Sequence, residues 1–129
     1  MGAKAFDTKT VYTGNMDEPS GFMLVEYSGG WPGYFNFCQD LITKIAEFAP
    51  NAYIYKLVED DGKTGRFEIS VYKNKLDLET NKNGELIHSM KQSKKFPWKT
   101  DWDQFKEVAI KHSTKAWDFV LKLEILKKT

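Results

Sequence analysis

Cysteine is nearly absent from this chain of 129 residues, in which Cys38 is the only one. A single cysteine excludes an intramolecular disulfide framework and a cysteine-rich zinc site. The two histidines, His88 and His112, form no metal-ligand spacing with the scattered carboxylates. We therefore expect no metal, no cofactor and a reduced, intracellular protein. The cytoplasm is the default compartment, and an organelle stays open as an alternative.

Arginine is just as scarce, because Arg66 is the only one among 19 basic residues. Arginine is the side chain that forks onto phosphates and guanine edges, so its scarcity argues against sequence-specific nucleic-acid binding. A lysine-favouring genome would explain the same composition. The 18 acidic residues leave a formal net charge of +1, so no overall field attracts nucleic acid or an anionic membrane. We expect no nucleic-acid partner.

Long apolar runs are also missing. No stretch of about 18 apolar residues occurs, and residues 1–15 show neither an apolar run of signal-peptide length nor an arginine-rich amphipathic pattern. The sequence thus predicts no membrane insertion. The hydrophobic content of 41% over this length favours one domain with its own core. We place that domain at residues 22–112, between an N-terminal extension, 1–21, and a C-terminal extension, 113–129.

Six segments of the domain follow the periodicity of strands or helices. Apolar residues recur at three and four positions from Tyr34 to Phe48, which predicts an amphipathic helix. A short link on each side of this helix implies a right-handed parallel crossover. A further short strand at Thr10–Tyr12 is considered. In chain order we predict strands at 22–28, 52–59, 66–72 and 85–90, and helices at 34–48 and 101–112.

Two polar segments are predicted to be loops. Residues 73–84 end in an Asn-Gly pair that can reverse the chain, which indicates a hairpin with a long loop. Residues 91–100 carry four lysines and no regular period. These lysines could dock an acidic partner or form a solvated surface. Within this segment we expect Phe96, Pro97 and Trp98 to pin the chain back onto the domain.

The C-terminal extension contains an apolar segment at 116–126. As a helix its apolar residues would spread around the whole circumference, whereas as a strand they share one face. We therefore predict an extra strand, which would pair with a sheet edge of its own domain or with a partner's sheet. The face that it would present consists of Trp117, Phe119, Leu121, Leu123 and Ile125.

The order strand, helix, three strands, helix is that of a thioredoxin-like domain, and four stretches resemble the selenoprotein W-like (Rdx) family. "EYSGGWPGY" stands where the family has Tyr, then Cys-x-x-Cys or Cys-x-x-selenocysteine, then Gly-Tyr. "AEFAPNAYI", "TGRFEIS" and "ELIHSMKQSKKFP" are similar to later blocks of the family. The resemblance covers about residues 22–112. It implies an α/β (α+β) fold with a four-stranded mixed sheet and helices packed on it.

The redox motif itself is lost, because Ser28 and Trp31 occupy its two outer positions. The hairpin loop is also longer than the family's, and both ends are extended. Thiol-disulfide chemistry needs a thiolate at the helix N-terminus and a second thiol three residues on. A serine hydroxyl cannot replace a thiolate in that chemistry. A hydrolytic role fails as well, since a nucleophile elbow needs Gly where Glu26 stands. We interpret Ser28 as structural.

Binding is the function that remains. Trp31 is a large aromatic residue at a loop tip that this fold normally exposes, and such residues anchor interfaces. We predict a redox-inactive, non-enzymatic, thioredoxin-like protein that acts as a protein-binding, structural or accessory subunit in a hetero-assembly or homo-oligomer. The alternative is a thiol oxidoreductase of selenoprotein W type that uses Cys38 or a partner's thiol. The candidate interface residues are Trp31, Trp98, Trp117, Phe119, Leu121 and Leu123.

Overall fold

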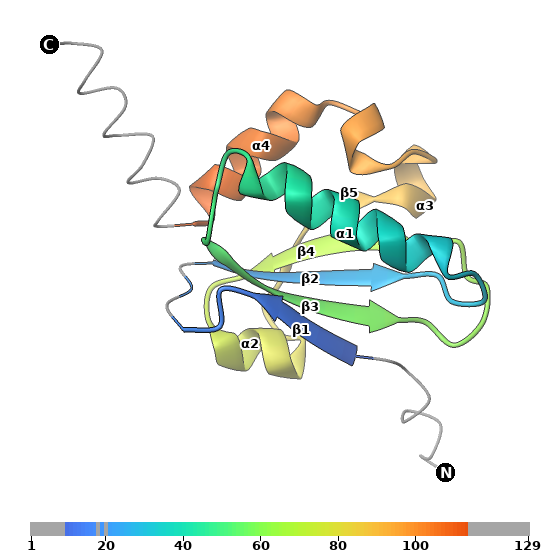
Figure 1. Cartoon of the computed structure of the whole chain (residues 1–129), viewed down its shortest axis with the longest axis horizontal. Helices are drawn as coiled ribbons and strands as arrows, with labels where there is room; N and C mark the ends of the chain where they lie inside the picture. Colours follow the sequence, from blue (N-terminus) through green and yellow to red (C-terminus); the bar gives the residue numbers. More distant parts are fainter. Residues whose placement is uncertain (1–9, 18, 20, 114–129) are drawn as a thin grey trace, which may run out of the picture.

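Five strands form one mixed sheet in the computed structural model of the chain, which describes residues 10–17, 19 and 21–113 (Figure 1). Their order across the sheet is β1-β3-β2-β4-β5. The central strands β2 and β3 are parallel, and every other neighbouring pair is antiparallel. The fold is therefore α+β, as expected, but its sheet has five strands where the sequence predicted four. The strands are β1 (Thr10–Gly14), β2 (Gly21–Tyr27), β3 (Tyr53–Glu59), β4 (Phe67–Tyr72) and β5 (Glu85–Ser89).

The additional strand, β1, comes from the segment assigned to the N-terminal extension. It pairs with β3 in antiparallel register, with Val11 opposite Leu57 and Tyr12 opposite Lys56. The position confirms the short strand considered near Thr10. The family resemblance implied four strands, and β1 has no apolar run that would have indicated a fifth: four of its five residues are exposed, so no buried face appears in its sequence.

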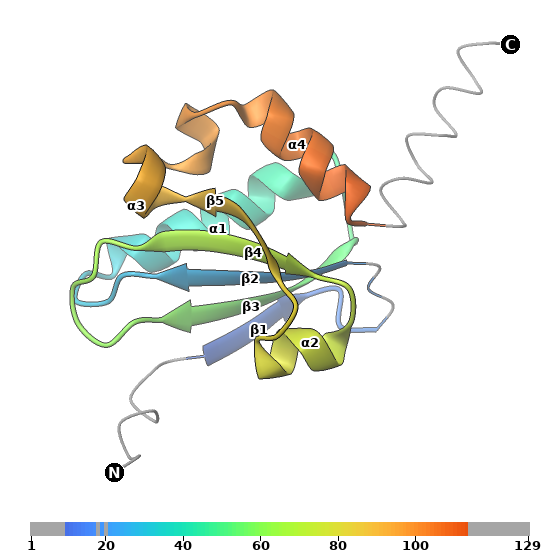
Figure 2. The same ribbon diagram turned by 180° about the vertical axis from the view of Figure 1, so that it is seen from behind.

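Helix α1 (Gly33–Ala46) connects β2 to β3 and lies on one face of the sheet (Figures 1 and 2). Its buried side chains, Cys38, Leu41 and Ile45, keep the predicted spacing of three and four. Burying a leucine such as Leu41 contributes about 1.5–3 kcal/mol, so truncation to alanine there would cost about 2–5 kcal/mol. The strand residues that complete this core include Met23, Val25, Tyr53, Tyr55, Leu57, Phe67, Ile69 and Val71.

Helix α4 (Trp102–Lys111) lies on the same face as α1. Asp101 caps its N-terminus, because an Asp101 Oδ1 oxygen accepts a hydrogen bond of 3.1 Å from the Gln104 backbone N–H. Phe105 and Ala109 enter the core. The hydroxyl of Tyr53 donates to the Ala109 carbonyl and so ties β3 to this helix.

The predicted long hairpin loop at 73–84 contains a helix instead, α2 (Lys75–Thr80), on the opposite face of the sheet (Figures 1 and 2). Asn74 caps it by accepting from the Asp77 backbone N–H at 2.8 Å, and Asn81 ends it in a left-handed conformation. Leu78 is its only buried residue, so the helix shows no apolar period in the sequence. This residue packs in a second, smaller cluster with Leu24, Ile54 and Tyr72.

The lysine-rich segment after β5 is also more ordered than the predicted loop. It contains α3 (Met90–Ser93) and a 3-10 turn, η2 (Pro97–Lys99). The Glu68 carboxylate holds the start of α3, because it accepts from the Ser89 hydroxyl at 2.6 Å and the Met90 backbone N–H at 2.8 Å. Both elements are too short for periodicity to reveal them.

The three residues expected to pin this segment do so. Pro97 is buried, and the Phe96 ring lies 5.3 Å from that of Phe67 in the core. Trp98 stacks on Phe96 with ring centroids 5.2 Å apart. Within the described residues, none of the helices has the length and apolar character that a membrane span requires. The predicted C-terminal strand lies outside the described residues.

Candidate binding surface at the loop between β2 and α1

The loop 28–32 and the turn 60–66 form one unit at the edge where the parallel strands β2 and β3 both end. The Asp60 backbone N–H donates to the Tyr27 carbonyl at 2.8 Å, and the Gly29 N–H donates to the Gly62 carbonyl at 2.9 Å. Gly29 permits this approach, because a Cβ atom there would lie 2.2 Å from the Asp60 carbonyl oxygen. The loop 28–32 is therefore fixed by its neighbour, the turn 60–66.

Ser28 is the central link between the two segments, and only 2% of its surface is exposed. Its Oγ accepts from the backbone N–H groups of Thr64 and Gly65, both at 3.0 Å, and donates to the Gly29 carbonyl at 3.2 Å. A hydroxyl has one proton and two lone pairs, so these three bonds use its whole capacity. This arrangement agrees with the interpretation of Ser28 as a structural residue.

Arg66, the only arginine of the chain, joins the end of the turn 60–66 to its start, because it bonds to Asp60. Its Nε and Nη2 atoms donate to the two carboxylate oxygens of Asp60 at 2.9 and 2.6 Å, and Glu26 lies 3.4 Å away. Burial opposes ionisation of Asp60, but the hydrogen bonds from Arg66 and Thr64 outweigh it and lower the pKa of the carboxyl. The guanidinium is thus occupied by structural partners.

Cys38, the alternative redox residue, is fully buried on α1. Burial raises the pKa of its thiol to about 12, and the thiolate is the form that reacts. The two histidines lie elsewhere: His88 Nε2 is 2.9 Å from the Lys95 carbonyl oxygen, and His112 Nε2 is 3.4 Å from a Glu85 oxygen. In the described part of the chain, no group of three or more His, Cys, Asp or Glu residues is arranged to hold a metal ion.

Trp31 is the most exposed aromatic residue of this loop, with 52% of its surface accessible. Its ring meets Tyr34 and Phe37 edge-on, with centroids 5.5 and 5.8 Å apart, so the indole is held in one orientation. It lies directly over Gly33, where a Cβ atom would come within 2.3 Å of the ring. The glycine in the sequence "WPG" therefore leaves room for the indole beside the first turn of α1.

Phe37 connects Trp31 with a second predicted interface residue. Its ring is 5.8 Å from that of Trp31 and 6.3 Å from that of Trp98, and the Lys44 Nζ lies 5.5 Å from the Trp98 ring centroid. The structure thus brings two of the six candidate interface residues into one aromatic cluster. The other four, Trp117, Phe119, Leu121 and Leu123, lie outside the described residues.

A cavity of about 540 Å³ opens beside Trp31, which is within the size range of ligand and peptide side-chain pockets. We call it the Trp31 cleft. Its lining is mainly apolar, and among the described residues that line it Glu59 is the one with a charged side chain. The residues that line the Trp31 cleft are Val11, Tyr27, Gly30, Trp31, Pro32, Phe35, Asn36 and Glu59.

Sequence reasoning missed four of these residues: Val11, Phe35, Asn36 and Glu59. Glu59 could have been found, because parallel strands end at the same edge of a sheet and this residue ends the strand beside β2. Phe35 and Val11 could not, since Phe35 lies off the apolar stripe of α1 and Val11 reaches the cleft only through the pairing of β1 with β3.

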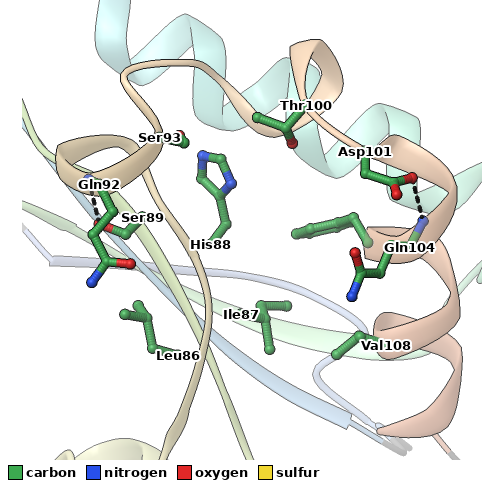
Figure 3. A pocket seen from close by; sticks show the side chains of 11 residues that line it. Leu86, Ile87, His88, Ser89, Gln92, Ser93, Thr100, Asp101, Gln104 and Val108 are labelled. Carbon is green, nitrogen blue, oxygen red and sulfur yellow. Dashed lines mark hydrogen bonds between the residues drawn. The ribbon is translucent and has the colours of Figure 1, made fainter.

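A second cavity, of about 460 Å³, lies between β5 and α4 at the other edge of the sheet (Figure 3). Several polar groups around it already bond to their neighbours: Asp101 accepts from Gln104, and the Ser89 Oγ accepts from the Gln92 backbone N–H at 3.2 Å. His88 in its wall is likewise occupied by the Lys95 carbonyl.

Comparison of the chain with protein-family models, with curated proteins and with solved structures found no match.

Proposed function

We propose that the chain is a redox-inactive, thioredoxin-like protein related to the selenoprotein W-like family, and that it acts as a protein-binding, structural or accessory subunit. The observation that carries the proposal is Trp31, which is half-exposed, held by two aromatic rings and bordered by the Trp31 cleft. A rigid exposed indole next to a pocket is the usual form of an interface hot spot.

The size of the exposed surface supports a substantial contribution to binding. A tryptophan buries about 150–250 Å² when it is fully covered, so covering the exposed half of Trp31 would remove about 100 Å² from water. At about 25 cal/mol per Å², that burial contributes about 2.5 kcal/mol. Because Tyr34 and Phe37 already fix the ring, little side-chain entropy is lost on binding.

The chemistry of the loop supports the redox-inactive part of the proposal. Ser28 stands at the first position of the former motif with all its hydrogen bonds made, and Trp31 stands at the second. The alternative function, a thiol oxidoreductase, would need Cys38 as a thiolate at the surface, whereas burial seals this thiol and raises its pKa.

The order of elements supports the proposed relationship. From β2 onwards the chain runs strand, helix, strand, strand, strand and helix, apart from the short insertions α2, α3 and η2. This is the order expected of the family, with β1 added at one edge of the sheet. Selection for a binding surface would retain this core and would allow its reactive residues to be lost.

The test is affinity purification with quantitative mass spectrometry, using the full chain and two variants. Trp31→Ala removes the proposed anchor. Leu76→Ala is the matched control, because Leu76 is an exposed apolar residue, 67% accessible, on α2 at the opposite face of the sheet. We expect a set of proteins that the wild type and Leu76→Ala both retain and that Trp31→Ala loses. Equal recovery with all three proteins would contradict the proposal, and so would disulfide-reductase turnover by the wild type.

A further inference from the structure

Among the residues that the structure describes, β1 is an edge strand that lacks the protection usual for such strands. It stands first in the sheet order, and among the described residues only β3 pairs with it. An edge strand exposes backbone N–H and C=O groups that can pair with another chain, and proteins usually blunt such edges with charges, proline or bulges. The sequence of β1, Thr-Val-Tyr-Thr-Gly, contains no charge and no proline. It is built mainly from residues that favour strands.

The pairing register places the Trp31 cleft beside this edge. Val11 lies opposite Leu57, a residue of the main core, and therefore points to the face of the sheet that carries α1. It is 40% exposed and lines the cleft together with Trp31 and Phe35. A strand added to β1 would present every second side chain to that same face, over the cleft.

Glu59 gives the surface a charge preference. Val58 pairs with Thr10, the first residue of β1, so Glu59 lies just beyond that end of the strand. Glu59 is half-buried, and it takes part in none of the ion pairs found among the described residues. A lysine or arginine of a bound segment would complement this carboxylate. An acidic segment would be repelled.

We propose that β1 and the Trp31 cleft together bind an extended peptide segment of a partner protein by strand addition. The segment pairs its backbone with β1, places an apolar side chain between Val11, Phe35 and Trp31, and carries a lysine or arginine toward Glu59. Main-chain pairing supplies affinity in this mode, and the side chains over the cleft supply specificity. This inference rests on the proposed function and specifies the chemistry of the partner.

The experiment is a selection of peptides displayed on phage against the full chain, followed by affinity measurement with the selected synthetic peptides. We expect enrichment of sequences in which apolar residues alternate with polar ones and a lysine or arginine follows. Val11→Lys should reduce the affinity of these peptides at least tenfold, because it places a charge on the edge and in the cleft. Leu86→Lys is the matched control, since Leu86 is an exposed apolar residue, 50% accessible, on the other edge strand, β5.

Two further variants separate the side-chain contacts. Trp31→Ala should weaken peptide binding about thirtyfold, as expected for a hot-spot residue. Glu59→Gln should weaken binding about threefold to fivefold for cationic peptides and leave neutral ones unchanged. Amide hydrogen exchange of residues 10–14 should slow when the peptide binds, because the outward N–H groups of β1 become paired.

Several results would overturn the inference. These are selection of acidic or helical peptides, equal binding by Val11→Lys and wild type, or a dimer in light scattering that covers β1 with a second copy. The outcome also separates the two proposals. If Trp31-dependent partners are captured but no peptide pairs with β1, the inference fails and the proposed function stands. If Trp31 is dispensable in both experiments, both fail.

Discussion

Replacing Ser28 with alanine removes the hydroxyl that joins the loop 28–32 to the turn 60–66. Two backbone N–H donors, those of Thr64 and Gly65, lose their acceptor. A buried donor left without a partner costs about 1–3 kcal/mol. Thr64 is half-buried, whereas Gly65 is exposed and water can take the place of the hydroxyl there. We therefore expect Ser28→Ala to lower the free energy of unfolding by about 2 kcal/mol.

The assay is urea unfolding at equilibrium, followed by circular dichroism and supported by thermal melts. For a domain of this size, a loss of about 2 kcal/mol lowers Tm by about 6–10 °C. Ser70→Ala is the control, because Ser70 is a half-buried strand serine whose hydroxyl makes no hydrogen bond to another described residue. Its unfolding free energy should stay within about 0.5 kcal/mol of wild type.

A Ser28→Ala protein as stable as Ser70→Ala would refute the reasoning. The hydroxyl would then contribute nothing to holding the two segments together, and its interpretation as a structural residue would lose its physical basis. A large loss of stability in both variants would point to general sensitivity of the sheet to serine substitution.

The remaining predictions concern one thiol, one carboxylate and one glycine. Cys38 should react with iodoacetamide in the native protein far more slowly than in urea, and fast native labelling would contradict its burial. Because the folded pKa of Asp60 is lowered, its stabilising contribution is complete above the unfolded pKa of about 4 and is lost as pH falls through the folded value. The stability difference between wild type and Asp60→Asn should therefore be greatest above about pH 4 and shrink in acid, whereas a difference independent of pH would exclude this linkage. Gly33→Ala should displace the Trp31 indole and weaken partner binding while the unfolding free energy stays within about 1 kcal/mol of wild type, and unchanged binding would show that the ring position does not matter.

Periodicity predicted the elements that bury a regular face. The spacing of Cys38, Leu41 and Ile45 places α1 correctly, because each of these residues enters the core. β4 alternates Phe67, Ile69 and Val71 toward the core, and its bounds differ from the prediction by one residue. In these elements the residues that recur with the period of the helix or strand are the residues that are buried, so the pattern predicts the element.

The elements that sequence reasoning missed bury little. β1 is mostly exposed and is held by its backbone pairing to β3. Backbone pairing does not require apolar side chains, so the sequence of β1 shows no apolar strand pattern. α2 buries only Leu78, and its start depends on the Asn74 cap. Four-residue α3 depends on a carboxylate from a different strand, Glu68, which no local pattern can reveal.

The sequence predicted where in the chain the candidate site lies, but not which other residues come together to form its surface. The resemblance of "EYSGGWPGY" to a redox loop located Ser28 and Trp31, and the structure places them in the loop between β2 and α1. That Ser28 bonds to Thr64 depends on the parallel pairing of β2 with β3, which brings residues 36 apart in the chain together. The Trp31 cleft likewise depends on the antiparallel register of β1, which places Val11 beside the loop.

The most direct test of the binding surface is fluorine NMR of the full chain labelled with 5-fluorotryptophan. The chain has four tryptophans, and the Trp31 resonance can be assigned by its loss in Trp31→Phe. A partner isolated by affinity purification is then titrated into the labelled protein. A shifted or broadened Trp31 resonance, with the Trp102 resonance unchanged, is the predicted result. An unchanged Trp31 resonance in a saturated complex would contradict the claim that partners bind at this surface.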